Sequence, residues 1–305
     1  LELFRYQARE NAVYREYLSA LHVEPASIRE LRAIPFLPIR FFKTHPVKTG
    51  PFEPALIFES SGTPGMQTSR HFVADPGLYE SSFIHGFERV YGPVKDYCII
   101  GLLPSYLERQ HSSLVYMVDH LIRLSAHPES GFYLHETEQL ARKLELLEQS
   151  GQKTILIGVT YALLDFAIQH PMTLRHTILM ETGGMKGRRK ELIREEVHQQ
   201  LMEAFKVPGV HSEYGMTELL SQAYATRDGL FQCPPWMRVL MRDEEDPLSI
   251  REEGAGIMNI IDLANRDSCA FIATEDAGRP GPDGRFQVLG RMDGSDLRGC
   301  SLLIV

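Results

Sequence analysis

The sequence predicts an α/β fold: a doubly wound parallel sheet with helices on both faces, joined to a smaller β-rich unit. Between about residues 56 and 205, short apolar runs alternate with helical patterns, as expected of a parallel sheet covered by helices. Past residue 206, shorter segments with frequent Pro, Gly and Asp indicate short strands. The chain has 305 residues, 43% of them hydrophobic, which suffices for one large domain or two closely packed ones. We divide it into residues 1–205 and 206–305.

The expected helices follow from apolar side chains at helical spacing and from capping residues. Residues 3–21 show this spacing and predict one or two amphipathic helices. Asp75 and Pro76 begin a helix through Val90, because aspartate is a good N-cap and proline suits the first helical position. Further helices are expected at 113–124, at 136–149, from 158 to about 170, and up to 205.

The expected strands are short apolar runs bounded by turn residues. In the first part they cover 56–58, 97–103, 154–158 and 177–181, and in the second part 255–262 and 268–274. Residues 34–43 are also apolar but contain Pro35 and Pro38, so we expect an extended strap over the core. Ligands bind at the carboxyl ends of parallel strands, so the loops after these strands are expected to line one crevice.

Composition excludes several classes of protein. The formal net charge of −8 argues against a nucleic-acid-binding surface, which would carry a basic stripe. The four cysteines are widely spread without a CxxC pair, and the twelve histidines show no metal-ligand spacing, which favours a reducing, cytoplasmic location. No apolar run reaches the roughly 20 residues that span a bilayer, so no membrane span is expected.

The loop that follows the strand at 56–58 is the first candidate binding element. Residues 59–65 read Glu-Ser-Ser-Gly-Thr-Pro-Gly, so several backbone N–H groups and three hydroxyls can face one point, which suits phosphate oxygens. No Gly-Lys-Ser/Thr sequence closes the loop, so it is not a Walker A loop. An ordinary turn between two elements has the same composition.

Three further segments carry groups suited to a nucleotide. Residues 214–218 (Tyr-Gly-Met-Thr-Glu) offer an aromatic ring for a base and a carboxylate for Mg²⁺, although a strand end running into a helix looks similar. Asp276 can accept from the hydroxyls of a ribose, or lie in a solvated acidic turn. Arg291 can reach a sugar or phosphate, or be a surface arginine.

In this order, these segments resemble the core motifs of the adenylate-forming superfamily, which contains acyl-CoA synthetases, peptide-synthetase adenylation domains and firefly-type luciferases. The resemblance covers roughly residues 56–300 and includes Gly183 and Gly184. More narrowly, residues 103–109, 181–187 and 297–302 look like the acyl-protein synthetase of the bacterial bioluminescence fatty-acid reductase system. The fold that this resemblance implies is the N-terminal domain of an adenylate-forming enzyme without its mobile C-terminal domain.

The resemblance implies a role for each matching residue. Those that would hold the β- and γ-phosphates of ATP are Ser60, Ser61, Gly62, Thr63 and Gly65. Those that would face the adenine are Gly183, Gly184 and Tyr214. The remaining residues are Thr217 for a phosphate, Glu218 for Mg²⁺, Asp276 for the ribose hydroxyls and Arg291 beside it.

The implied reaction has two steps. A carboxylic acid, in this family a fatty acid, attacks the α-phosphate of ATP to give an acyl-adenylate, and a protein thiol then takes the acyl group and passes it to a partner. Cys300 matches the family's acceptor cysteine, and a small residue packed beside its apolar neighbours is the alternative. Tyr106, His111 and Thr160 lie on loops expected to border the acyl pocket, although such a histidine is more often structural.

The sequence departs from the superfamily pattern in two places. The phosphate loop lacks a lysine after its second glycine, where Arg70 can stand in. About a hundred residues expected after the Arg291 region are absent, and the acyl-protein synthetases resemble this chain in that respect. A coenzyme A ligase whose missing lobe is dispensable or supplied by another chain, and a non-catalytic nucleotide-binding scaffold, remain as rival functions. An acyl reductase or an acyl-carrier protein is the expected partner.

Overall fold

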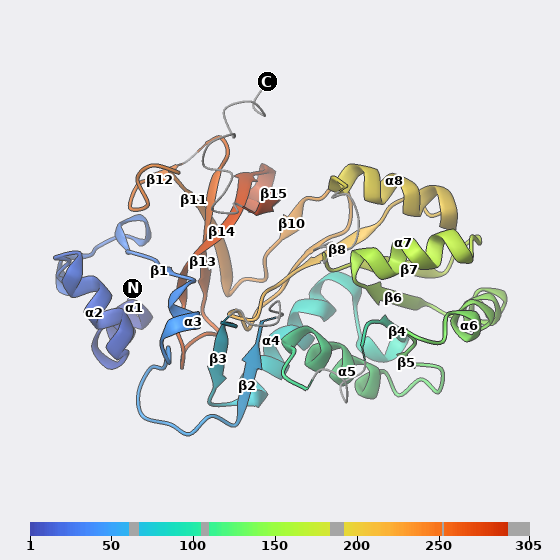
Figure 1. The fold of residues 1–305 in the computed structure, drawn as a ribbon, viewed down its shortest axis with the longest axis horizontal. Helices are drawn as coiled ribbons and strands as arrows, with labels where there is room; N and C mark the ends of the chain where they lie inside the picture. Colours follow the sequence, from blue (N-terminus) through green and yellow to red (C-terminus); the bar gives the residue numbers. More distant parts are fainter. Residues whose placement is uncertain (61–66, 105–109, 184–191, 252, 292–305) are drawn as a thin grey trace. The chain divides into compact units, whose positions relative to one another are not determined.

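The computed structural model describes residues 1–60, 67–104, 110–183, 192–251 and 253–291. It forms two compact units (Figure 1). Unit 1 comprises Leu1–Pro76, Glu218–Leu220 and Gln232–Val305, and unit 2 comprises Gly77–Thr217 and Ser221–Phe231. The sequence-based division cuts the chain once, at residue 205, whereas each unit of the structure combines separate segments of the chain. The reason is that the N-terminal segment packs with the C-terminal strands.

Unit 2 contains the parallel sheet that the sequence predicts. Its strands are β4 (Cys98–Leu102), β5 (Gly131–Phe132), β6 (Thr154–Gly158), β7 (Thr177–Glu181), β8 (His211–Tyr214) and β9 (Ala223–Ala225). The order is β9-β8-β7-β6-β4-β5, with β9 antiparallel to β8 and the other pairs parallel. Every residue of β4 and of β6 is buried, which explains why both strands read as continuous apolar runs.

Helices cover both faces of this sheet (Figure 1). They are α4 (Pro76–Tyr91), α5 (Ser113–Ser125), α6 (Thr137–Ser150), α7 (Thr160–Gln169) and α8 (Arg194–Phe205). Apolar side chains of α6, α7 and α8 form one core with Ile100 and Leu156. On the opposite face, Gly101 lies so close to α5 that a Cβ added to it would be 3.2 Å from the side chain of Val118. The doubly wound arrangement is confirmed.

Unit 1 is the β-rich part of the chain. Its antiparallel strands are β11 (Met237–Arg242), β12 (Ile250–Arg251), β13 (Gly256–Asp262), β14 (Phe271–Pro280) and β15 (Phe286–Arg291), in the order β12-β11-β13-β14-β15. A separate hairpin pairs β2 (Leu56–Glu59) with β3 (Arg70–Val73). The short strand β10 (Phe231–Gln232) contains the last residue of one segment of unit 2 and the first of the next segment of unit 1. Unit 1 also has 3₁₀ turns at Pro25–Ser27, Leu31–Ala33 and Pro282–Gly284, and unit 2 has one at Val94–Asp96.

The N-terminal segment belongs to unit 1 because its aromatic residues pack on β14. The rings of Phe4 in α1 (Glu2–Glu10) and Tyr14 in α2 (Ala12–Ala20) lie 5.9 and 6.3 Å from that of Phe271. The strap is extended at β1 (Leu37–Pro38), which pairs in parallel with β14, and then forms a helical turn, α3 (Phe41–Thr44). Such contacts join residues more than 200 positions apart, so local sequence patterns do not reveal them.

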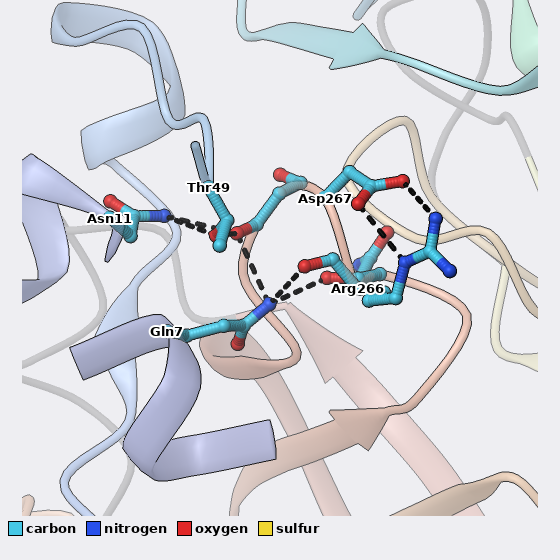
Figure 2. A network of polar contacts seen from close by, with 7 residues as sticks. Gln7, Asn11, Thr49, Arg266 and Asp267 are labelled. Atoms are coloured by element: carbon cyan, nitrogen blue, oxygen red, sulfur yellow. Dashed lines mark hydrogen bonds and ion pairs between the residues drawn. The ribbon is translucent and has the colours of Figure 1, made fainter. Parts of the chain in front are cut away.

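A buried polar network fixes the turn between β13 and β14 in unit 1 (Figure 2). The Nε2 group of Gln7 donates to the carbonyl oxygens of Asn265 at 2.8 Å and Arg266 at 2.9 Å. The Nδ2 group of Asn11 donates to the carbonyl of Ser268 at 3.0 Å, to which the Thr49 hydroxyl also donates. Gln7 and Asn11 are fully buried, so the turn has little freedom to move.

Candidate functional site

Glu218 lies in unit 1, where the turn after β13 holds its main chain from both sides. Asn265 Nδ2 donates to the carbonyl oxygen of Glu218 at 2.8 Å. The N–H group of Leu220 donates to Asp262 Oδ2 at 2.8 Å. Asn265 and Asp262 are both 0% exposed, and the network of Figure 2 anchors the same turn through Gln7. The main chain at Glu218 is therefore fixed by buried hydrogen bonds.

The carboxylate of Glu218 is buried in unit 1, where it bonds to Ser69 and feels the charges of Asp276 and Arg291. Burial raises the pKa of Glu218, and the negative charge of Asp276 acts in the same direction. A hydrogen bond with Ser69 and the positive charge of Arg291 oppose this rise in pKa. Asp276 and Arg291 lie opposite each other on β14 and β15. Three predicted residues of unit 1 are thus coupled: Asp276 and Arg291 pair across two strands, and the charges of both act on Glu218.

Ser60 and Ser69 close the hairpin that carries the candidate phosphate loop. Ser60 N–H donates to the Ser69 carbonyl at 3.1 Å, and Ser69 N–H donates to the Ser60 hydroxyl at 2.9 Å. Ser69 is 2% exposed and also contacts Glu218, so it joins the hairpin to that carboxylate. The sequence analysis missed Ser69. Its signal is the register of the hairpin, which places it opposite Ser60 once Glu59 pairs with Arg70.

Gly183 and Thr160 lie together in unit 2, beside Glu181. Gly183 follows β7, is exposed, and has a φ of +75°, a conformation that favours glycine. Its N–H donates to Glu181 Oε2 at 2.8 Å. The Thr160 hydroxyl donates to the same oxygen at 3.0 Å, and Thr160 is 4% exposed. The structure therefore gives this hydroxyl a buried partner, whereas the sequence analysis placed Thr160 on a pocket border.

The remaining predicted residues of unit 2 that the structure describes are Tyr214, Thr217 and His111. Tyr214, the last residue of β8, is 8% exposed, and its ring meets the edge of Phe231 at 5.9 Å. Thr217 is partly exposed, and His111 is exposed in the turn before α5. The predicted residues outside the described part of the chain are Ser61, Gly62, Thr63, Gly65, Tyr106, Gly184 and Cys300.

Glu213 in β8 is a second buried carboxyl group of unit 2. Burial, reinforced by the negative charge of Glu181, raises the pKa of Glu213 to about 8. One of its oxygens lies so close to Gly215 that a Cβ there would be 2.5 Å away. A side chain at position 215 would therefore collide with this carboxyl group, and glycine leaves room for it.

The variant Glu213→Gln is expected to weaken the pH dependence of stability. Between the ordinary glutamate pKa near about 4.3 and about 8, folded Glu213 keeps a proton that the unfolded chain releases, so the free energy of unfolding falls as pH rises. Glutamine does not titrate. In Glu213→Gln, the decrease in the free energy of unfolding between about pH 5 and about pH 8 should therefore be smaller by on the order of 3 kcal/mol. Urea unfolding at both pH values measures it. Glu195→Gln, at an exposed position of α8, is the control, and equal pH dependence of stability in both variants would contradict the assignment.

The donor groups around Glu218 fit Mg²⁺. Among the residues that the structure describes, no group of three or more His, Cys, Asp or Glu side chains forms a metal site of its own. Magnesium usually binds through one or two carboxylates, keeping waters and substrate phosphates as its other ligands. The negative charge of Asp276 adds to the rise in the pKa of Glu218, and a cation beside the Glu218 carboxylate would oppose that rise.

The described cysteines are free, poorly ionised thiols. Burial raises the pKa of Cys98, and raises the pKa of Cys233 and of Cys269 to about 12. The thiolate is the nucleophilic form of cysteine, so none of these three is suited to accept an acyl group. In the described ranges, no helix is both long and apolar enough to cross a membrane.

The fold is that of the N-terminal part of adenylate-forming ligases. An open form of 2-hydroxyisobutyryl-CoA ligase, solved with 2-HIB-AMP and CoA, matches with a TM-score of 0.69 and 13% identity, over 96% of this chain and 73% of that chain. ATP-bound MatB from Rhodopseudomonas palustris matches with a TM-score of 0.59 and 15% identity, over 77% of this chain and 47% of that one. The matched region is thus about half the length of MatB.

The sequence identifies the family within this fold. The family model for the acyl-protein synthetase LuxE matches residues 1–305, and the chain belongs to this family. Among curated proteins, none matches the chain. The family and fold predicted from the motifs are confirmed.

Proposed function

We propose that this chain is an AMP-forming ligase that activates a carboxylic acid with ATP and Mg²⁺ and then carries the acyl group on Cys300. A long-chain fatty acid is the proposed substrate, and an acyl reductase or acyl-carrier protein the proposed recipient. Membership of the acyl-protein synthetase family supports this assignment. The wide spacing of the cysteines favours a cytoplasmic reaction.

The observation that carries the proposal is the gathering of Glu218, Asp276 and Arg291 in unit 1. These residues come from separate parts of the sequence, and together they would supply a metal ligand, an acceptor for ribose hydroxyls and a donor for sugar or phosphate oxygens. Arg291 Nη2 also lies 3.4 Å from Glu275 Oε2, and this ion pair restricts the orientation of the guanidinium group. A surface of unrelated charges has no reason to combine these three functions.

In the first step, a carboxylate oxygen of the acid attacks the α-phosphorus of ATP. The bond from that phosphorus to the bridging oxygen breaks, and pyrophosphate leaves with the electron pair. Glu218 would hold Mg²⁺, whose charge would stabilise the negative charge that gathers on the phosphate oxygens. Asp276 would orient the ribose, so that the two reacting anions meet in one geometry despite their repulsion.

In the second step, the thiolate of Cys300 attacks the carbonyl carbon of the acyl-adenylate. The bond from this carbon to the phosphate oxygen breaks, giving a thioester and AMP. The buried thiols of Cys98, Cys233 and Cys269 favour Cys300 as the acceptor, because their raised pKa values keep them protonated. Arg298, two residues away in the sequence, can support the thiolate form.

The test is an ATP–pyrophosphate exchange assay with a panel of carboxylic acids. We expect exchange that requires Mg²⁺ and is fastest with long-chain fatty acids. Exchange that responds to no acid, in a protein that still binds ATP, would identify a nucleotide-binding scaffold and overturn the proposal. AMP release that requires coenzyme A would instead identify a coenzyme A ligase.

A further inference from the structure

We propose that Glu181 is a positioning residue for the nucleotide base: its carboxylate fixes the backbone of Gly183 against the start of α7. This inference rests on the proposed function, in which Gly183 faces adenine. Glu181 is the last residue of β7 and is 5% exposed. The sequence analysis placed it at the end of a strand and at the start of the 181–187 segment, without a role of its own.

One carboxylate oxygen of Glu181 joins the exits of two parallel strands. Its Oε2 atom accepts from Gly183 N–H at 2.8 Å and from the Thr160 hydroxyl at 3.0 Å. Thr160 N–H in turn donates to the Gly183 carbonyl at 2.9 Å. Both polar backbone groups of Gly183 are therefore engaged, which fixes the direction of its peptide planes.

The other carboxylate oxygen connects the same point to α8. Glu181 Oε1 lies 3.6 Å from Arg194 Nε and 3.7 Å from His198 Nε2. His198 Nε2 lies 3.4 Å from the Ser212 hydroxyl of β8. Glu181 thus connects elements on both sides of β7, all at the carboxyl edge of the parallel sheet.

These partners keep Glu181 charged although it is buried. Burial would raise its pKa, but His198, Arg194 and the Gly183 N–H outweigh this and lower the pKa to about 2. A buried charge with several partners is weak support for stability, because packed apolar residues can do as well. Its benefit is a defined geometry, which a binding site needs.

Gly183 is placed where a ligand can approach the backbone. In parallel sheets, ligands bind beyond the carboxyl ends of the strands, and Gly183 lies two residues past β7. It is exposed, and a Cβ built on it would meet no atom of the described residues within 4 Å. The backbone that Glu181 holds therefore presents an open, flat face, as a planar base requires.

A matched control lies at the opposite end of the same strand. Glu148 at the end of α6 accepts from Arg175 N–H at 2.6 Å, from His176 N–H at 3.0 Å and from the Thr177 hydroxyl at 2.7 Å. It fixes the amino end of β7 as Glu181 fixes the carboxyl end. Glu148→Gln therefore tests the general cost of losing a carboxylate that anchors β7.

The experiment measures the binding of ATP, adenosine and inorganic tripolyphosphate to the full chain and to its Glu181→Gln and Glu148→Gln variants. We expect Glu181→Gln to weaken ATP and adenosine by about tenfold each, the value of about one charge-assisted hydrogen bond. Tripolyphosphate should bind as before, because it has no base. Glu148→Gln should leave all three affinities unchanged.

A smaller change provides a second variant that keeps the charge. Thr160→Val removes only the hydroxyl donor and should weaken ATP and adenosine by about threefold, again without affecting tripolyphosphate. Equal losses for tripolyphosphate and adenosine, unchanged adenosine binding, or the same losses in Glu148→Gln would overturn the inference. Failure of the unaltered chain to bind ATP would instead reject the proposed function, and the role of Glu181 with it.

Discussion

Replacing Cys300 with serine is expected to abolish the covalent acyl-protein and leave formation of the acyl-adenylate intact. The first step joins the acid to AMP and involves no thiol. The second step requires a thiolate, and a serine hydroxyl, which has a much higher pKa, is a far poorer nucleophile without a neighbouring base. The two steps should therefore separate in this variant.

Two measurements distinguish the acyl-transfer step from the adenylation step. Incubation with ATP, Mg²⁺ and a radiolabelled fatty acid should leave a label on the unaltered chain that mild base or hydroxylamine removes, as it does a thioester. The Cys300→Ser variant should carry none of this label. Its ATP–pyrophosphate exchange should stay within about twofold of the unaltered rate, since the transition state of adenylation is unchanged.

The other cysteines provide the controls for this prediction. Cys233→Ser, Cys98→Ser and Cys269→Ser should all keep the label, because burial holds the pKa of each thiol above its ordinary value and disfavours the thiolate. Label that persists on Cys300→Ser and disappears from Cys233→Ser would move the acceptor to Cys233. Loss of exchange together with the label would show that Cys300 acts earlier than proposed.

The parallel sheet could be predicted because its signals are local. Strands β4 and β6 are fully buried five-residue runs, β7 is buried at all positions but one, and helices α5 and α6 begin at or next to the expected positions. Each signal depends only on neighbours in sequence, such as the hydroxyl of Ser112, which accepts from Val115 N–H at the start of α5. Periodicity and capping therefore sufficed for unit 2.

The composition of unit 1 could not be predicted in the same way. The N-terminal helices join it through Gln7, which bonds to residues near position 266, and through β1, which pairs with β14. Nothing in the first forty residues specifies which distant strand they cover. From the sequence alone, a polar residue in an amphipathic helix, such as Gln7, is expected to be exposed to solvent, because its distant partners are unknown.

In the candidate site too, the sequence predicts some residues and misses others: it predicts those with ligand-binding chemistry and misses those that hold them in place. The chemistry of Glu218, Asp276 and Arg291 matches the parts of a nucleotide, which is why the sequence predicts them as ligands; in the structure the charges of Asp276 and Arg291 act on Glu218. The residues that support the candidates, Ser69 and Glu181, were missed because their function lies in contacts with other elements. A sequence can indicate which groups would touch a ligand more readily than which groups hold them.

Glu218→Gln is expected to reduce the rate of ATP–pyrophosphate exchange by about 100-fold or more, because it removes the charge that would hold Mg²⁺ at the phosphates. Titration with Mn²⁺ in the presence of ATP, followed by electron paramagnetic resonance, should show correspondingly weaker metal binding. Glu275→Gln is the matched control: this neighbouring carboxylate pairs with Arg40 and Arg291, and its loss should lower exchange by no more than about threefold.

This loss of activity should not come with a loss of stability. Burial raises the pKa of Glu218, so its ionised form is disfavoured in the folded chain. A neutral glutamine of the same shape relieves that cost, while the hydrogen bond from Asn265 to the carbonyl of residue 218 does not involve the side chain. Glu218→Gln should therefore melt at the same or a higher temperature than the unaltered chain, as expected where a site keeps a charge at the expense of stability. A variant that melts lower, or that exchanges pyrophosphate at the unaltered rate, would show that Glu218 is a structural residue and not a metal ligand.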